Sequence, residues 1–303
     1  MKNMKIAISG ATGLIGKKIV NKLINRNDEV IVLTRSIQKA KNVFDNKVNF
    51  VDWSKNFDEW KTQLENVDVV INLAGENVMA RRWNKEHKRK IYSSRINGTK
   101  KLVDAILSLT NKPKVFISAS AIGYYGNIND EVDENSKAGT DFLAKVVKDW
   151  EDASKSIEEK NIRRVIVRIG IVLDKNEGAL PKLVLPFKFF VGGSIGSGKQ
   201  WLSWIHVDDL IKIFLFAIDN EINGVYNAVS PNPVKMKYFA KTIGKILHRP
   251  SFFNVPEFVL KLVLGEGAAS ILNGAKVKSE KIQMAGFKFH YEKLEDSLIS
   301  LLK

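Results

Sequence analysis

The chain has 303 residues, 45% of them hydrophobic, which is enough for one large α/β domain with a smaller annex. It contains no cysteine, which excludes disulfides and cysteine-ligated metals and is typical of a cytoplasmic protein. The apolar stretches are too short or too interrupted by lysine to span a bilayer, and the first residues lack a signal-peptide pattern. We therefore expect a cytoplasmic protein without a membrane partner.

The net charge of +15 comes from 48 Lys and Arg against 33 Asp and Glu. Such an excess can indicate nucleic-acid binding. Nearly all of it is lysine, however, spread along the chain without a nucleic-acid-binding motif, and arginine, which is preferred for phosphate contacts, is scarce. We expect solvated lysine faces, with a small anionic ligand as a contributor, and no nucleic-acid partner.

Apolar runs and helical patterns alternate through residues 1–173. Strands are predicted at 5–9, 29–35, 47–53, 67–75, 114–121 and 163–173, and helices at 14–25, 86–109 and 141–160. Near-continuous Val and Ile runs between helical stretches are typical of parallel strands that are covered on both faces. Right-handed crossovers then predict the α/β class, with a Rossmann-type doubly wound parallel sheet.

The pattern changes after Leu173. Residues 178–201 carry two prolines and a glycine-rich loop, and the chain is mostly helical by pattern from about residue 231. We predict an NADP-binding Rossmann domain over 1–173, which regains a strand and a helix from about 203–228. The remainder of 174–303 is predicted to form a smaller, mostly helical C-terminal lobe on the substrate side of the sheet.

Three glycines spaced three apart join the first strand to the first helix in GATGLIG. Glycine permits positive φ and the close approach of a ligand, and a helix N-terminus favours anions. The pattern predicts a site for the pyrophosphate of a dinucleotide, with a plain turn as the alternative. The predicted contacts in this loop are Gly10, Thr12, Gly13, Leu14, Ile15 and Gly16.

The residues after the second strand predict which dinucleotide binds. Sites that prefer NAD place an acid there to hold the ribose 2′-hydroxyl, whereas this chain has Thr34, Arg35 and Ser36. An arginine would meet a 2′-phosphate, so we expect NADP(H), with a surface arginine as the alternative. Asp52, at the end of the third strand, is placed to meet the adenine amino group, and the backbone of residues 72–75 is expected to pass the cofactor.

Five motifs, GATGLIG, INLAGENV, SRINGTKKLVDAI, SASAIGYYG and WLSWIHVDDL, together indicate a family. With them the chain resembles the extended short-chain dehydrogenase/reductase superfamily, and more narrowly its atypical, sugar-nucleotide-epimerase-like "epimerase family" subgroup with a helical C-terminal domain of unknown function. The resemblance implies a Rossmann fold that binds NADP(H), and a homodimer is usual in the superfamily. Outside the glycine loop, the predicted cofactor contacts are Thr34, Arg35, Asp52, Leu73, Ala74, Gly75, Arg95 (a surface ion pair is its alternative) and Arg168.

The catalytic residues of that superfamily are incomplete here. Its reductases and epimerases use a serine together with a tyrosine and a lysine in YxxxK spacing, and the tyrosine is the acid/base. The corresponding helix has Asp141 and Lys145 at that spacing and no tyrosine. The resemblance places the catalytic serine at Ser120. Tyr124 of GYYG is the nearest substitute for the tyrosine, with a pocket-lining aromatic as its alternative.

Two functions remain open. One is an NADP(H)-dependent oxidoreductase or nucleotide-sugar epimerase of unknown small-molecule substrate, in which Ser120 polarises the reacting oxygen and Tyr124 moves the proton. The other is a non-catalytic NADP(H)-binding sensor or scaffold, which the missing YxxxK pair favours. We expect no metal site, because the histidine and two acids of WIHVDDL are more often structural than metal ligands.

Overall fold

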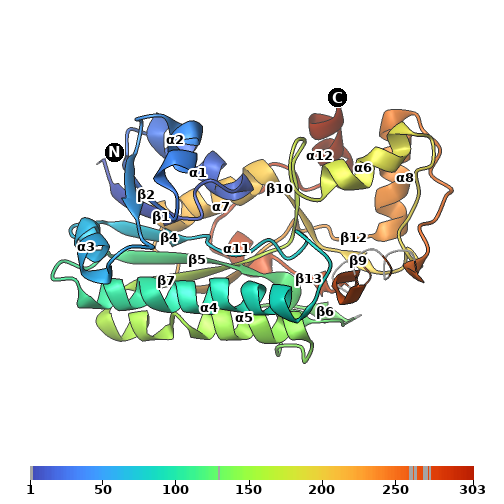
Figure 1. The fold of residues 1–303 in the computed structure, drawn as a ribbon. Coiled ribbons are helices and arrows are strands. Elements are labelled where there is room, and N and C mark those ends of the chain that lie inside the picture. Colours follow the sequence, from blue (N-terminus) through green and yellow to red (C-terminus); the bar gives the residue numbers. More distant parts are fainter. Residues whose placement is uncertain (1–2, 129, 259–261, 263–264, 269–271, 273) are drawn as a thin grey trace.

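A parallel sheet of seven strands lies at the centre of this computed structural model (Figure 1). The structure describes residues 3–128, 130–258, 262, 265–268, 272 and 274–303. Every neighbouring pair in the order β11-β7-β5-β4-β1-β2-β3 is parallel, which confirms the predicted Rossmann-type fold. The strands are β1 (Lys5–Ser9), β2 (Glu29–Thr34), β3 (Asn49–Asp52), β4 (Val69–Asn72), β5 (Val115–Ala121), β7 (Arg163–Ile169) and β11 (Gly224–Ala228).

Helices cover both faces of the sheet. α1 (Leu14–Asn25) and α7 (Val207–Asp219) lie on one face, and α4 (Lys85–Ser108) and α5 (Phe142–Asp152) lie on the other (Figure 1). The strand order runs outward from β1 in both directions, with β2 on one side and β4 on the other. Ligands of open parallel sheets bind at the carboxyl ends of the strands at such a reversal. The N-terminus of α1 lies at this place.

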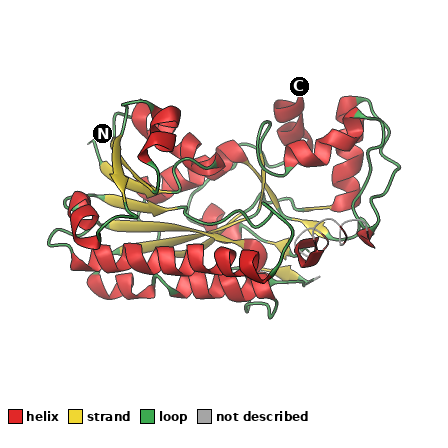
Figure 2. Ribbon diagram, in the orientation of Figure 1, coloured by secondary structure: helices red, strands yellow, loops and turns green. Residues whose placement is uncertain are grey.

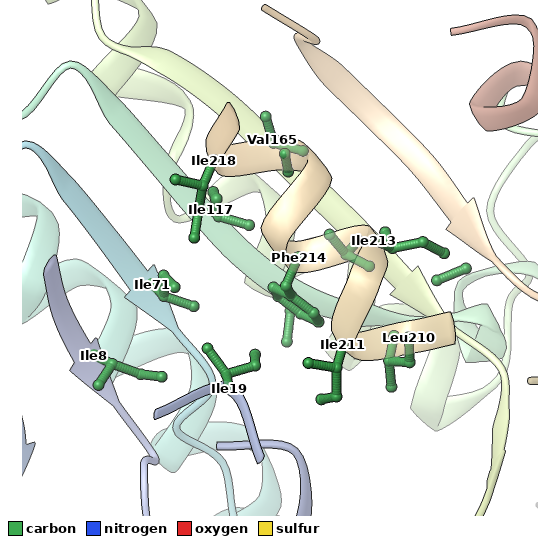
Figure 3. Packing of buried hydrophobic residues seen from close by; sticks show 14 of the residues in the cluster. Ile8, Ile19, Ile71, Ile117, Val165, Leu210, Ile211, Ile213, Phe214 and Ile218 are labelled. Atoms are coloured by element: carbon green, nitrogen blue, oxygen red, sulfur yellow. The ribbon is translucent and has the colours of Figure 1, made fainter. Parts of the chain in front are cut away.

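The largest core lies between the sheet and α7 (Figure 3). Phe214 is fully buried there, and the view shows its ring between α7 and the strands. The pattern of α7 explains this position, because its apolar residues recur at helical spacing and face one side. The labelled partners are Ile8, Ile19, Ile71, Ile117, Val165, Leu210, Ile211, Ile213 and Ile218.

The helix predicted at 141–160 and the strand predicted at 163–173 are each divided in two. α5 begins after Asp141 and ends at Asp152, and a 3-10 helix, Lys155–Lys160, follows it. The strand predicted at 163–173 is broken at Gly170, where a Cβ would lie 2.5 Å from the carbonyl oxygen of Ser203. After this close approach the chain leaves the main sheet, and β8 (Ile171–Leu173) pairs with β10 (Trp204–His206) instead.

Helices α6 (Leu180–Lys188), α8 (Met236–Leu247) and α12 (Leu294–Leu302) form a lobe beside the carboxyl edge of the sheet (Figure 2). This lobe has its own core around Leu180, Phe187, Trp204 and Phe239. The β10–α7–β11 segment returns to the main sheet, and β13 (Lys276–Val277) and α11 (Glu280–Met284) also pack on that side, against β6 (Glu131–Val132) and β11. No helix in the described ranges is long and apolar enough to cross a membrane. The remaining elements are α2 (Ile37–Phe44), α3 (Phe57–Lys61), β9 (Trp201–Leu202), β12 (Val234–Lys235) and the 3-10 helices Thr62–Leu64, Ile122–Tyr125 and Gly265–Ala268.

The WIHVDDL motif ties the C-terminal segment to α7. His206 is 2% exposed; its Nδ1 accepts a hydrogen bond from the Asp208 amide at 3.0 Å, and its ring stacks on Tyr291 with centroids 3.8 Å apart. The Asp209 carboxylate accepts from the amides of His290 and Tyr291 at 3.0 and 2.8 Å. The motif is therefore a structural tie in this chain.

Replacement of this histidine should change the pH dependence of stability. Burial lowers the pKa of His206 below its ordinary value of 6.5, so the unfolded state binds the proton more readily. The folded state should therefore lose stability as the pH falls below about 6.5. His206→Asn keeps a side-chain oxygen for the helix cap and should show a smaller loss between pH 7 and pH 5. Urea unfolding of the wild type and of His206→Asn measures how the free energy of unfolding changes with pH over this range. The same pH dependence in both proteins would contradict the assignment.

Candidate functional site

A groove of about 800 Å³ lies at the reversal of strand order. Its walls come from the loop after β1, the ends of β2 and β4, and the face of α4. Ser94, Gly98 and Lys101 share this face because they are spaced four and three residues apart on the helix. The lining residues are Gly10, Ala11, Thr12, Gly13, Val32, Leu33, Thr34, Arg35, Ser36, Lys39, Trp53, Ser54, Leu73, Ala74, Gly75, Glu76, Ser94, Gly98 and Lys101.

The three glycines of GATGLIG have different tasks. Gly10 has a φ of +71°, and a Cβ on it would lie 2.6 Å from the backbone carbon of Leu73. A Cβ on Gly16 would lie 2.4 Å from the carbonyl oxygen of Gly10. At Gly13 the corresponding distance is 3.4 Å, an ordinary contact, and this residue lines the groove. The fold thus requires glycine at the first and third positions, whereas the second is open to a ligand.

The N-terminus of α1 is prepared for an anion. Gly13 is its N-cap residue and offers no side chain to cap the helix, so the amides of Leu14 and Ile15 begin the helix without a side-chain acceptor in the described structure. The first turn carries no acidic residue. Unpaired N–H groups and the helix dipole therefore leave positive potential beside the groove.

The other end of the groove is cationic. Arg35 and Lys39 line it from the segment after β2, and Lys101 lines it from α4. Thr34 and Ser36 are held in a turn in which the Ser36 amide donates to Thr34 Oγ1 at 3.1 Å. Glu76 is the single acid among the lining residues of the described chain. This end therefore favours a ligand with an additional negative charge.

Asp52 lies just outside the groove. Its Oδ1 accepts hydrogen bonds from the Ser54 hydroxyl at 2.6 Å and the Ser54 amide at 3.0 Å, and these bonds lower the pKa of the carboxyl group. Ser54 and Trp53 line the groove in its place. The expected contact of Asp52 with adenine stays a prediction.

Arg95 lies beneath the strand-end segment that borders the groove. Its Nη1 donates to the carbonyl oxygens of Glu76 at 2.9 Å and Ile91 at 3.2 Å, and a Cβ on Gly75 would lie 3.1 Å from its Cζ. Burial lowers the pKa of Arg95 to about 10. No carboxylate of the described chain forms an ion pair with it. The guanidinium thus supports the backbone of Gly75 and Glu76, and the Glu76 carboxylate offsets part of its charge.

Ser120 and Arg168 belong to a buried network, not to the lining of the groove. Arg168 is 3% exposed, and its Nε and Nη2 donate to the two carboxylate oxygens of Glu151 at 2.8 and 2.9 Å. The Ser120 hydroxyl donates to the same carboxylate at 2.6 Å. Although burial alone would lower the pKa of Arg168, the bonds to Glu151 raise it. The single hydroxyl proton of Ser120 is thus committed to Glu151, and its expected role at a reacting oxygen would require this bond to break. The expected contact of Arg168 with the cofactor stays a prediction.

Of the two tyrosines of GYYG, Tyr125 belongs to this buried network and Tyr124 is partly exposed. Arg168 Nη1 donates to the Tyr125 hydroxyl at 3.0 Å, and that hydroxyl donates to Asn227 Oδ1 at 2.7 Å. Burial raises the pKa of Tyr125 to about 12, so this phenol stays protonated. Tyr124 is partly exposed, and its ring stacks on the guanidinium of Arg168, with Cζ 3.4 Å from the ring centroid.

Asp141, at the position where the superfamily has its catalytic tyrosine, has a structural role. Asp141 is the N-cap residue of α5, and its Oδ1 accepts from the Ala144 amide at 2.9 Å. Lys145 donates to Asp149 at 3.0 Å, and the Tyr92 hydroxyl donates to the same Asp149 oxygen at 3.0 Å. Asp141 therefore caps the start of α5, and Lys145 forms an ion pair with Asp149 on the outer face of this helix.

Several groove residues were not predicted from the sequence. They are Ala11, Val32, Leu33, Lys39, Trp53, Ser54, Glu76, Ser94, Gly98 and Lys101. The spacing of Ser94, Gly98 and Lys101 on one helical face was a usable signal. Lys39 lies three residues after the cap Ser36 and could have been found by placing the start of α2 beside the groove.

These features define a dinucleotide-binding protein with an extended Rossmann fold, and the chain belongs to the NAD dependent epimerase/dehydratase family. The model of that family matches residues 6–228. A second model, a domain of unknown function (DUF1731), matches residues 255–301 in the C-terminal lobe. The family agrees with the predicted class of cofactor and with the resemblance described above.

Similar proteins extend over the whole chain. The chloroplastic SDR39U1 homolog of Arabidopsis thaliana, an epimerase family protein, is 40% identical over 99% of this chain and 87% of its own length. The crystal structure of human epimerase family protein SDR39U1 with NADPH is 31% identical, with a TM-score of 0.88, over 98% of this chain and 99% of that one. A nucleoside-diphosphate sugar epimerase from Corynebacterium glutamicum is 30% identical with a TM-score of 0.79; it covers 99% of this chain and 58% of that one.

Alanine substitutions should separate the glycine that faces the ligand from the glycine that the fold needs. Gly13→Ala should leave the melting temperature within a few degrees but weaken NADPH binding about tenfold or more, because the methyl group enters the groove. Gly16→Ala should lower the melting temperature, since the Gly10 carbonyl must move. Thermal melts and fluorescence titration measure the two effects. Equal NADPH affinity of Gly13→Ala and the wild type would show that no phosphate lies at this residue.

Proposed function

We propose that the protein binds NADP(H) in the groove, with the pyrophosphate at the N-terminus of α1 and the 2′-phosphate beside Arg35 and Lys39. The observation that carries the proposal is the set of cations at the β2 end of the groove, Arg35, Lys39 and Lys101, with no carboxylate among the described residues that line this end. A 2′-phosphate carries the extra negative charge that distinguishes NADP(H) from NAD(H). The NADPH in the structure of the human relative supports this choice.

We further propose that the protein is an oxidoreductase or epimerase that acts on a small polar substrate between the sheet edge and the C-terminal lobe. The name of the Corynebacterium glutamicum relative supports a nucleotide sugar as the substrate class. Bound NADP(H) supplies hydride chemistry. Within the chain, Tyr124 is the proposed proton donor, because its hydroxyl has no hydrogen-bond partner among the described residues while its ring is held over Arg168. Ser120 acts indirectly. Its hydroxyl donates to the Glu151 carboxylate, which holds Arg168 under the ring of Tyr124.

A non-catalytic NADP(H)-binding sensor or scaffold is the second candidate. The observation that favours it is the structural use of Asp141, which caps α5 at the place where the acid/base tyrosine belongs. Ser120 is likewise engaged by Glu151. In this case the groove would bind the dinucleotide, and the C-terminal lobe would respond to whether the nicotinamide is oxidised or reduced.

Substitutions at the cationic end should change cofactor preference more than stability. Arg35→Ala and Lys39→Ala should each weaken NADPH binding about tenfold, since each removes a charge-assisted contact to phosphate, and should leave NADH binding nearly unchanged. Lys41→Ala is the matched control, because Lys41 lies on α2 with Lys39 but does not line the groove. Fluorescence titration with both cofactors measures the ratio. A parallel loss of NADPH and NADH affinity in Arg35→Ala would refute the 2′-phosphate assignment.

Turnover should distinguish the two candidate functions. Wild-type protein should consume NADPH in the presence of a carbonyl substrate, or, loaded with NADP+, should oxidise and re-reduce a nucleotide sugar and so epimerise it. Tyr124→Phe should reduce either rate about 10²-fold or more. The cofactor affinity of this variant should match the wild type. Tyr238→Phe, which removes an exposed tyrosine hydroxyl on α8, is the control. Tight NADPH binding with no turnover on any compound would support the sensor, and full activity of Tyr124→Phe would exclude Tyr124 as the acid.

A further inference from the structure

The end of the C-terminal lobe exposes a group of apolar side chains on two neighbouring segments. One segment runs from α6 into the following loop, and the other is the loop after α8 (Figure 1). The exposed fractions reach 70% at Phe189 and 73% at Phe252. We call this group the aromatic patch; its members are Leu185, Phe189, Phe190, Val191, Phe252 and Phe253.

The two loops that carry the patch are held firmly together. The Phe253 amide donates to the Gly192 carbonyl at 3.2 Å, and the Val255 amide donates to the Ser194 carbonyl at 2.9 Å. A Cβ on Gly193 would lie 1.1 Å from the carbonyl oxygen of Phe253, so the backbones approach as closely as glycine allows. The rings are therefore presented by a fixed support.

Phe190 shows that the exposure is imposed by the backbone. This residue has a φ of +62°, a left-handed conformation that is costly for an aromatic side chain. The Val191 amide donates to the Pro186 carbonyl at 3.0 Å and closes the turn. Arg249 lies over the ring of Phe190, with Cζ 4.3 Å from the centroid. The turn thus keeps Phe189, Phe190 and Val191 outside the core of the lobe.

The two chain ranges that carry or adjoin the patch are strongly cationic. Residues 180–191 and 236–256 contain no Asp or Glu. No ion pair joins any of their basic side chains to an acid of the described chain. Glu257 follows the second segment directly, and Glu295 of α12 accepts a hydrogen bond from Tyr238 on another side of α8. The cations of these two ranges are Lys182 and Lys188 on α6, Lys237, Lys241 and Lys245 on α8, and Arg249 in the loop after α8.

Although the sequence alone predicts no membrane partner, from these surface features we propose that the aromatic patch docks the protein on the surface of a lipid bilayer that contains anionic lipids. Phenylalanine and leucine side chains enter the boundary between headgroups and acyl chains, while flanking Lys and Arg attract anionic headgroups. The cationic border disfavours a second copy of the chain, because like charges would meet across a symmetric interface. A peptide partner would need a groove, and none of the three cavities described for this chain includes a residue of the patch.

Sedimentation with vesicles tests this proposal. The wild type should bind vesicles that contain phosphatidylglycerol and should not bind vesicles of pure phosphatidylcholine, and added salt should weaken the binding. Phe189→Ser with Phe252→Ser should lower the partition coefficient about tenfold or more, because two apolar anchors are lost. Lys188→Glu with Lys245→Glu should lower it by at least as much.

The control pair combines Met284→Ser, at a residue that is 79% exposed elsewhere, with the exposed Lys100→Glu. It should bind as the wild type does, and thermal melts verify that every variant is folded. Absence of binding to anionic vesicles, or equal binding by all variants, would overturn the proposal. A concentration-dependent dimer in light scattering that disappears in Phe189→Ser with Phe252→Ser, without vesicle binding, would assign the patch to a second copy instead.

Discussion

The close approach of three backbone segments at the end of β1 is the constraint on which the rest of the site depends. Gly10 turns with positive φ directly against the backbone of Leu73, and Gly16 packs α1 against the carbonyl oxygen of Gly10. Because no side chain separates these segments, the N-terminus of α1 comes to the carboxyl ends of β1 and β4. This contact places the anion site, brings the backbone of Leu73 and Ala74 along the groove, and sets the distance from the anion site to Arg35, directly after β2.

A second constraint acts on the other half of the sheet edge. Glu151, Arg168 and Ser120 join α5, β7 and β5 through buried charge-assisted hydrogen bonds. Breaking such a pair by removing one partner costs about 3–5 kcal/mol, because an uncompensated charge stays buried. The same network holds Tyr125 and supports Tyr124 by stacking. The region where a short-chain reductase places its proton-transfer residues is therefore rigid here, and Tyr124 is its accessible phenol.

The sequence predicts the central fold well because the short continuous apolar runs of buried parallel strands differ from the 3.6-residue period of amphipathic helices. The helix predicted at 14–25 has the observed bounds. Of the predicted contacts in the glycine loop, Gly10, Thr12 and Gly13 line the groove, whereas Leu14, Ile15 and Gly16 do not. The break at Gly170 could not be predicted, since it depends on Ser203 approaching from a distant segment. Arg35 lines the groove as expected, whereas Ser120 and Arg168 do not, because the carboxylate of Glu151 that holds them comes from the next helix. Residue type and strand position indicate which side chains are near a site, but partners distant in sequence determine which of them face it.

The return of the chain to the main sheet after residue 203 affects how the protein is made. β11 pairs with β7 at one edge, and α7 covers Ile71, Ile117 and Val165 on one face, although both elements follow α6 and β9 of the other lobe. On the ribosome, six strands of the sheet are synthesised before the helix that buries this face. The nascent chain must therefore keep an apolar sheet face and the unpaired edge of β7 protected until residue 228 has emerged, an interval in which exposed strands are prone to aggregate. The two lobes are thus a single unit of biosynthesis, and neither can be completed before the other has begun.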